Sequence, residues 1–395
     1  MEPGARTTGW LRRTADRGWA TFAAGRDALV GRMPQPVGVA AGLRARRASM
    51  ILLIGLIAFA FAVIGALYGA APLSLSQLWT ASVEAITGAD PSDRAASAIF
   101  LHVRLPRMLL GAFVGAGLAL AGCAMQGLFR NPLADPGLIG VTAGATVGAV
   151  TAIVLGGVLF AEAPDAFKPY AVPVMAFLGA ALVTVLVFQV AGVARDHTGQ
   201  GASVATLLLA GVAIQAIAAA GVAALAYISD DQQLRDLTFW SLGGLGGADW
   251  PSIIVAVTLI GIAAAAIIRR ARALDLLQLG ERAAFCSGVD VAREKLILGG
   301  FGALAVAAGV AVAGPIGFIG LVAPHMARLL VGPNHVYALP ASALMGAALI
   351  LAADLAVRTI VPPAEPPIGL ATSLIGGPFF LYLLIRPSFR SARHA

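Results

Sequence analysis

The sequence is poor in charge. Only 12% of its 395 residues are Asp, Glu, Lys or Arg, against roughly 25% in an ordinary soluble domain, whereas 59% are hydrophobic. A soluble protein of this length has no interior large enough for so many apolar side chains, so a soluble enzyme is excluded. Because a membrane helix needs about 20 apolar residues, the composition predicts an all-α integral membrane protein with about ten transmembrane helices.

Signatures of catalysis and metal binding are also lacking. Lysine occurs only at positions 168 and 295, and neither belongs to the Gly-Lys-Ser/Thr phosphate loop of an ATPase. The five histidines show no paired ligand spacing, and no Ser or Cys lies in a nucleophile-elbow pattern. Cys123 and Cys286 lie far apart in unlike contexts, which argues against a disulfide framework. We therefore interpret the chain as non-enzymatic by itself, with no metal site and no cofactor of its own.

Stretches without a charged residue locate the predicted spans. They cover 48–83, 108–129, 136–161, 169–194, 197–229, 250–268, 296–327, 329–353 and 366–385. The seventh contains Gly314-Pro315, and proline favours a break, so we divide it into two short spans that meet at a tight turn. The predicted organisation is an Arg-rich tail at 1–47, a ten-helix domain at 48–387 and a short tail at 388–395.

The basic residues predict how the chain crosses the membrane. With ten crossings and the N-terminus inside, six of the 27 basic residues fall outside, namely Arg94, Arg104, Arg107, Lys168, Arg235 and Arg358. Nine crossings would place more of them outside, so the positive-inside rule favours ten, with both termini cytoplasmic. The net charge of +7 then reflects sidedness and indicates no nucleic-acid partner. The tail at 1–47 is a cytoplasmic extension or, alternatively, an amphipathic helix on anionic lipid.

Glycines at helical spacing predict close helix packing. Gly140, Gly144 and Gly148 make one smooth face, and Gly111 and Gly115 repeat the pattern on the preceding span. We expect ordinary tight packing there, with a sliding surface as the alternative.

Ionisable groups at membrane depth are nearly missing. Asp354, directly after the charge-free run 329–353, is the one acid at membrane depth, and Arg358 lies one helical turn later, so the two are expected to pair. A proton relay needs a second acid to receive the proton. The energy for transport is therefore expected to come from another subunit.

Two segments predict docking surfaces. On the inside, 274–290 reads as two short amphipathic helices separated and ended by glycines, which suits a partner protein; a solvated connector is the alternative. On the outside, Arg104 and Arg107 precede the second span, and with Arg358 they predict a cationic rim for an acidic partner. Arginines that reach lipid phosphates are the alternative reading there.

Ordered motifs carry a family resemblance. They are RLPR at 104–107, QGLFRNPLADPGLIG at 126–140, LLLAG at 207–211, WSLGGLGGADW at 240–250, LGERA at 279–283, GPIGFIGLVAPHMAR at 314–328, PIG at 367–369 and GGPF at 376–379. In this order the chain resembles the FecCD-type permease subunits of type II ABC importers, which take up iron-siderophores, haem and cobalamin. The resemblance covers about 95–386.

The resemblance implies a ten-helix fold and several partners in a bacterial cytoplasmic membrane. A second permease subunit, identical or homologous, would share the path; two cytoplasmic ATPases would hold ATP and Mg, and an external binding protein would deliver the cargo. It implies that Arg104, Arg107 and Arg358 dock the binding protein. It implies that ATPase coupling involves Leu279, Gly280, Glu281, Arg282, Ala283 and Gly288. It also implies a cytoplasmic gate at Gly201, Ala202 and Ser203, although the loop 195–203 is longer and richer in glycine than the family pattern.

Two other classes of protein stay open at this stage. A proton-coupled secondary transporter or exporter would need more intramembrane acids than Asp354 alone. An intramembrane enzyme would need a nucleophile or metal constellation, and the motifs show none. The sequence does not name the chelate, nor does it decide whether the second permease subunit is identical.

Overall fold

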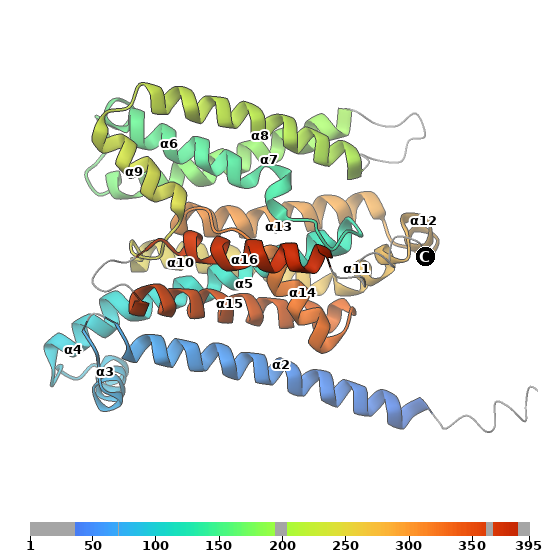
Figure 1. The fold of residues 1–395 in the computed structure, drawn as a ribbon, viewed down its shortest axis with the longest axis horizontal. Helices are drawn as coiled ribbons and strands as arrows, with labels where there is room; N and C mark the ends of the chain where they lie inside the picture. Colours follow the sequence, from blue (N-terminus) through green and yellow to red (C-terminus); the bar gives the residue numbers. More distant parts are fainter. Residues whose placement is uncertain (1–35, 70, 194–203, 361–365, 386–395) are drawn as a thin grey trace, which may run out of the picture. The chain divides into compact units, whose positions relative to one another are not determined.

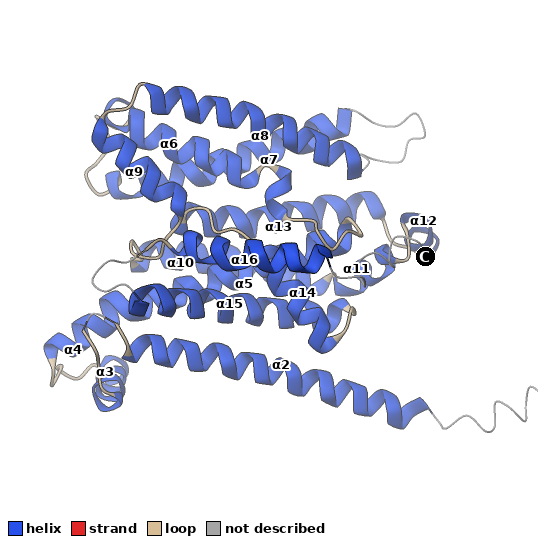
Figure 2. Ribbon diagram, viewed as in Figure 1, coloured by secondary structure: helices blue, strands red, loops and turns tan. Residues whose placement is uncertain are grey.

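The computed structural model describes residues 36–69, 71–193, 204–360 and 366–385. Every regular element within these ranges is helical (Figure 2). The chain divides into two compact units, 1–49 and 50–395. In the first unit the described part is the beginning of helix α2, where the side chains of Arg44 and Arg46 are exposed. The second unit holds the bundle.

Within the described ranges, eight helical stretches are long and apolar enough to cross a membrane, and two shorter apolar helices accompany them. The long ones are α2 (Pro36–Leu67), α4 (Arg94–Ile99) continuing through η1 (Phe100–Arg104) into α5 (Leu105–Leu128), α6 (Val141–Leu159), η3 (Lys168–Tyr170) with α7 (Ala171–Val193), α8 (Val204–Tyr227), α10 (Trp250–Arg269), α13 (Val291–Ala313) and α15 (His335–Ile360). The shorter ones are α14 (Ile319–Val331) and α16 (Ile368–Ile385). These ten helices lie at the ten predicted positions.

Connecting elements complete the described chain. They are α3 (Leu75–Thr87), η2 (Pro136–Ile139), α9 (Asp231–Leu242), α11 (Ala271–Gln278) and α12 (Glu281–Cys286). In the second unit, α3 and α4 lie at one end of the bundle, whereas α11 and α12 lie at the opposite end (Figure 1). Below, these are the α3/α4 end, predicted to be external, and the α11/α12 end, predicted to be cytoplasmic.

The prediction of two short spans around Gly314 is half wrong. The structure breaks there, since α13 ends at Ala313 and Gly314 has a φ of +67°. However, α13 has 23 residues and only α14 is short, with 13. The reason lies at the start of α13: the side chain of Asp290 caps the helix, so that it begins within a charged stretch, before the charge-free run.

Helix α5 forms the centre of the bundle and packs against α10, α13, α14 and α15 (Figure 1). Glycines make these approaches possible. A Cβ on Gly115 would lie 2.3 Å from the carbonyl oxygen of Gly346, and a Cβ on Gly122 would lie 1.9 Å from that of Gly320. These are backbone-to-backbone contacts that any side chain would disrupt.

The predicted glycine face of α6 packs in the same way. A Cβ on Gly144 would lie 2.4 Å from the carbonyl oxygen of Gly179, and a Cβ on Gly148 would lie 1.9 Å from that of Met175, both on α7. The expectation of tight packing is confirmed.

Residues 314–318, called the non-helical segment below, join α13 to α14 beside the middle of α5. Phe318 there has a φ of +66°, which is uncommon for a residue with a side chain. The carbonyl of Ala313, freed at the end of α13, accepts a hydrogen bond from Gly244 at 2.8 Å. Irregular backbone at membrane depth is stable only where protein or a water-filled cavity covers it, so this segment marks an interior site.

Candidate functional site

At the α3/α4 end, a buried carboxylate binds two arginines. Nε of Arg107 lies 2.8 Å from Oδ1 of Asp354, and Nη2 of Arg358 lies 2.9 Å from Oδ2. The side chain of Asp354 is 2% exposed and those of the arginines 9% and 7%. The predicted pairing of Asp354 with Arg358 is confirmed, while the pairing with Arg107 was not foreseen.

The arginines at this end also close the C-terminus of α2. Arg104 donates from its two terminal nitrogens to the carbonyls of Ala66 and Ala71. Arg358 donates to the carbonyls of Gly65 and Tyr68, each at 3.3 Å. Gly65 and Ala66 lie in the last turn of α2, where carbonyls lack partners within the helix, so the guanidinium groups supply the missing donors there. Tyr68 and Ala71 belong to the connection that follows the helix.

Of the three arginines of the predicted cationic rim, Arg104 and Arg107 are buried within this chain, which the sequence does not indicate. Arg104 and Arg107 are 5% and 7% exposed, because their donors turn inward to Asp354 and to the end of α2. A sequence pattern places a residue at the mouth of a span but does not show whether its partners lie inside or outside. Docking of an acidic partner stays a prediction for them.

At the α11/α12 end, the segment 274–290, which is predicted to couple to an ATPase and is called the coupling segment below, forms the two short helices that its glycines predict. Gly280, with a φ of +113°, separates α11 from α12, and Gly288, at +86°, follows α12. Leu274 and Leu277 face inward and are fully buried. Among the predicted coupling residues, Arg282, Ala283 and Gly288 are exposed and Glu281 is half-buried, with its carboxylate 2.8 Å from Nζ of Lys295.

Two large apolar side chains of this segment point outward. Leu279 is 73% exposed and Phe285 is 72% exposed. Both lie in the connection between α10 and α13, outside the helices that are long and apolar enough to cross a membrane. Exposed apolar side chains of this kind indicate a protein contact.

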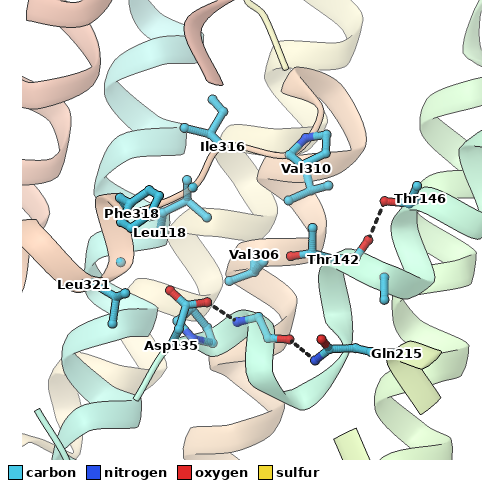
Figure 3. A pocket seen from close by; sticks show the side chains of 16 residues that line it. Leu118, Asp135, Thr142, Thr146, Gln215, Val306, Val310, Ile316, Phe318 and Leu321 are labelled. Carbon is cyan, nitrogen blue, oxygen red and sulfur yellow. Dashed lines mark hydrogen bonds between the residues drawn. The ribbon is translucent and has the colours of Figure 1, made fainter. Parts of the chain in front are cut away.

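A half-open cavity of about 500 Å³ lies between helices of the bundle, beside the non-helical segment. Its walls come from α5, η2, α6, α8, α13 and residues 315–321. Oδ1 of Asp135 accepts from the backbone of Gly137 at 2.7 Å, and the carbonyl of Gly137 accepts from Gln215 at 3.1 Å, a connected row along the cavity (Figure 3). Most other lining side chains are apolar, such as Leu118, Val310 and Phe318.

Sequence reasoning missed this cavity. Asp135 entered only as part of a motif, and Thr142, Thr146 and Gln215 were not singled out. A usable signal was present, since Thr142 and Thr146 share one face of an apolar helix and Gln215 is the one amide side chain of α8. The predicted gate residues Gly201, Ala202 and Ser203 lie outside the described residues.

Comparison with known proteins agrees with this architecture. Residues 50–386 match the model of the FecCD transport family. The hemin transport system permease protein HmuU of Yersinia pestis is 44% identical over 337 residues, which cover 85% of this chain and 94% of that protein. The cobalamin import system permease protein BtuC of Halobacterium salinarum is 42% identical over 282 residues, covering 71% of this chain and 72% of the relative.

A solved structure shares the fold. It is an inward-facing ABC transporter described as of the metal-chelate type, and it superposes with a TM-score of 0.73 at 31% identity, over 85% of this chain and 99% of that one. The helical bundle and these matches define a membrane-embedded permease of the ABC transporter class, a transport component and not an enzyme. The chain belongs to the FecCD transport family.

Proposed function

We propose that the chain is the permease subunit of an ATP-driven importer for a haem-, cobalamin- or iron-siderophore-type chelate. With a second permease subunit it forms the translocation path. Two ATPase subunits carry ATP and Mg on the cytoplasmic side, an external binding protein delivers the cargo, and both termini of the chain are cytoplasmic.

The observation that carries this proposal is the coupling segment. Gly280 and Gly288 shape it, Leu274 and Leu277 anchor it on the bundle, and Phe285 points outward. An apolar side chain exposed in water is stabilised when a partner covers it, and an ATPase is the partner that an ABC permease requires.

The cavity supports a transport path for a large, mostly apolar cargo. Its walls are apolar apart from a few hydrogen-bonding groups, among them Asp135, Thr142 and Gln215. Such walls hold a chelate weakly, which favours passage over retention, and selectivity then belongs to the binding protein. Haem is the first cargo to test, because the hemin permease is 44% identical over 85% of this chain.

Reconstitution tests this function directly. The permease, its ATPase and its binding protein are placed in proteoliposomes, and uptake of haem, cobalamin and a ferric siderophore is measured. We expect uptake of one of them only with ATP and the binding protein present. Uptake driven by a proton gradient without ATP would instead support a secondary transporter.

A further inference from the structure

At the α11/α12 end, Asp275 of α11 binds His335 of α15 twice. The backbone N–H of His335 donates to Oδ1 of Asp275 at 2.9 Å, and the ring Nδ1 donates to the same oxygen at 2.7 Å. The first N–H groups of a helix lack partners within it and attract negative charge. One carboxylate of the coupling segment thus caps α15 and fixes the first side chain of that helix.

The ring of His335 is also seated against α5. It is fully buried, and a Cβ on Gly127 would lie 2.5 Å from Nε2 of His335 and 3.1 Å from the Leu274 side chain. Three helices, α5, α11 and α15, therefore meet at Gly127, where only glycine leaves room for both side chains.

This arrangement is not the one that stability alone would favour. Nε2 of His335 is buried and has no hydrogen-bond partner among the described residues. A buried polar atom without a partner lowers stability, and an apolar side chain would fill the place without that loss. An unpaired polar atom inside an otherwise well-packed bundle indicates that the residue is kept for function and not for stability. What histidine provides here, and an apolar residue would not, is the side-chain hydrogen bond to Asp275.

The contact continues toward the cavity. Gln126, next to Gly127 on α5, accepts a hydrogen bond from Arg328 of α14 and donates to the carbonyl of Gly320 at 3.2 Å. Gly320 lines the cavity. A chain of direct contacts therefore runs from the coupling segment through His335 and α5 to the cavity wall.

We infer that the Asp275–His335 pair, seated on Gly127, is the rigid link that transmits movement of the coupling segment to α15, α5 and the cavity wall. His335 is a positioning residue in this scheme. The inference rests on the proposed function, since it requires an ATPase bound to the coupling segment.

The test compares His335→Ala with His335→Asn in the reconstituted transporter. Alanine removes the side-chain bond to Asp275, whereas the asparagine amide can donate in place of Nδ1. Because His335 is fully buried, neither change alters the surface offered to the ATPase. We expect His335→Ala to retain ATPase association and ATP hydrolysis. The amount of cargo imported per ATP should fall about tenfold, which is within the usual range of allosteric coupling between two sites. His335→Asn should restore most of the loss.

A double-variant cycle shows whether Asp275 and His335 act together or whether each residue contributes to import independently. Asp275→Ala removes both the side-chain bond and the cap of α15, so if the pair acts as one unit, adding His335→Ala to it should cause no further loss of import per ATP. Lys168→Ala, which removes an exposed ion pair with Asp165 at the α3/α4 end, is the control and should change nothing. If His335→Ala does not fold, Asp275→Ala against Asp275→Asn makes the same comparison, because the amide keeps the accepting oxygen.

Three results would overturn the link: unchanged import per ATP in His335→Ala, equal impairment in His335→Asn, or losses that multiply in the double variant. A wild-type permease that binds no ATPase would overturn the proposed function and the link together. If the wild-type transporter assembles and imports, and His335→Ala imports as much cargo per ATP as the wild type, the link is wrong while the proposed function stands.

Discussion

Arg107 and Asp354, 247 positions apart in the sequence, form an ion pair of 2.8 Å between Nε and Oδ1 that joins α5 to α15. With Arg358 on the second carboxylate oxygen, one buried acid neutralises part of the charge of two buried bases. Such an arrangement is sensitive to loss of its central member, since removal of the Asp354 charge leaves two buried guanidinium groups without their shared carboxylate.

Replacement of Asp354 by Asn should therefore destabilise the permease strongly. Loss of a buried partner costs about 3–5 kcal/mol, whereas loss of an exposed pair costs about 0–1 kcal/mol. Asp165→Asn, which breaks the exposed pair with Lys168, is the matched control. Thermal unfolding in detergent measures both, and equal melting temperatures would contradict the structural role of Asp354.

Docking of the binding protein on Arg104 can be separated from the role of this arginine in the fold. Arg104→Gln and Arg104→Glu both remove the guanidinium group that binds Ala66 and Ala71, and thermal unfolding of the two variants measures how far their structural damage differs, since only the glutamine amide can still donate. Only the glutamate adds a negative charge. If an acidic partner docks here, its affinity should be lower for Arg104→Glu than for Arg104→Gln, most clearly at low salt, where screening is weakest. Equal affinities at low salt would remove Arg104 from the docking surface.

Phe285 should matter for ATPase binding and not for folding. It is 72% exposed, so Phe285→Ala removes little packing within the chain. A central aromatic contact at an interface is worth about 2 kcal/mol or more, which corresponds to a loss of affinity of about thirtyfold. Co-purification and titration with the ATPase measure the effect. Val158→Ala, at an apolar position of α6 that is 83% exposed, should leave affinity unchanged, and an equal loss there would point to a nonspecific effect.

The cavity can be filled without a change at the coupling segment. Ala143 lines it from α6, so Ala143→Trp should block import while ATPase association persists. Leu159→Trp places the same bulk on an exposed position of the same helix and should import normally. Uptake per assembled complex is the measurement, and normal uptake by Ala143→Trp would exclude this cavity from the path.

Much of this protein could be predicted from local sequence. Charge-free runs predict the spans because each membrane helix satisfies its own backbone and needs only apolar length. Gly280 and Gly288 predict the breaks around α12, since the conformation that ends a helix is a property of one residue. Gly144 and Gly148 predict a close helix contact because a smooth helical face is readable from spacing alone, whereas the structure shows that the partner is α7.

The tertiary structure decided whatever depends on a distant partner. Arg104 and Arg107 are buried because the groups that satisfy them, the end of α2 and Asp354, reach them only when three helices pack. The seat of His335 on Gly127 and the cavity beside Gly320 likewise join segments that the sequence separates. Spacing along the chain fixes which side of a helix a residue occupies, but the packing of the other helices determines whether that side meets lipid, water or a buried charge.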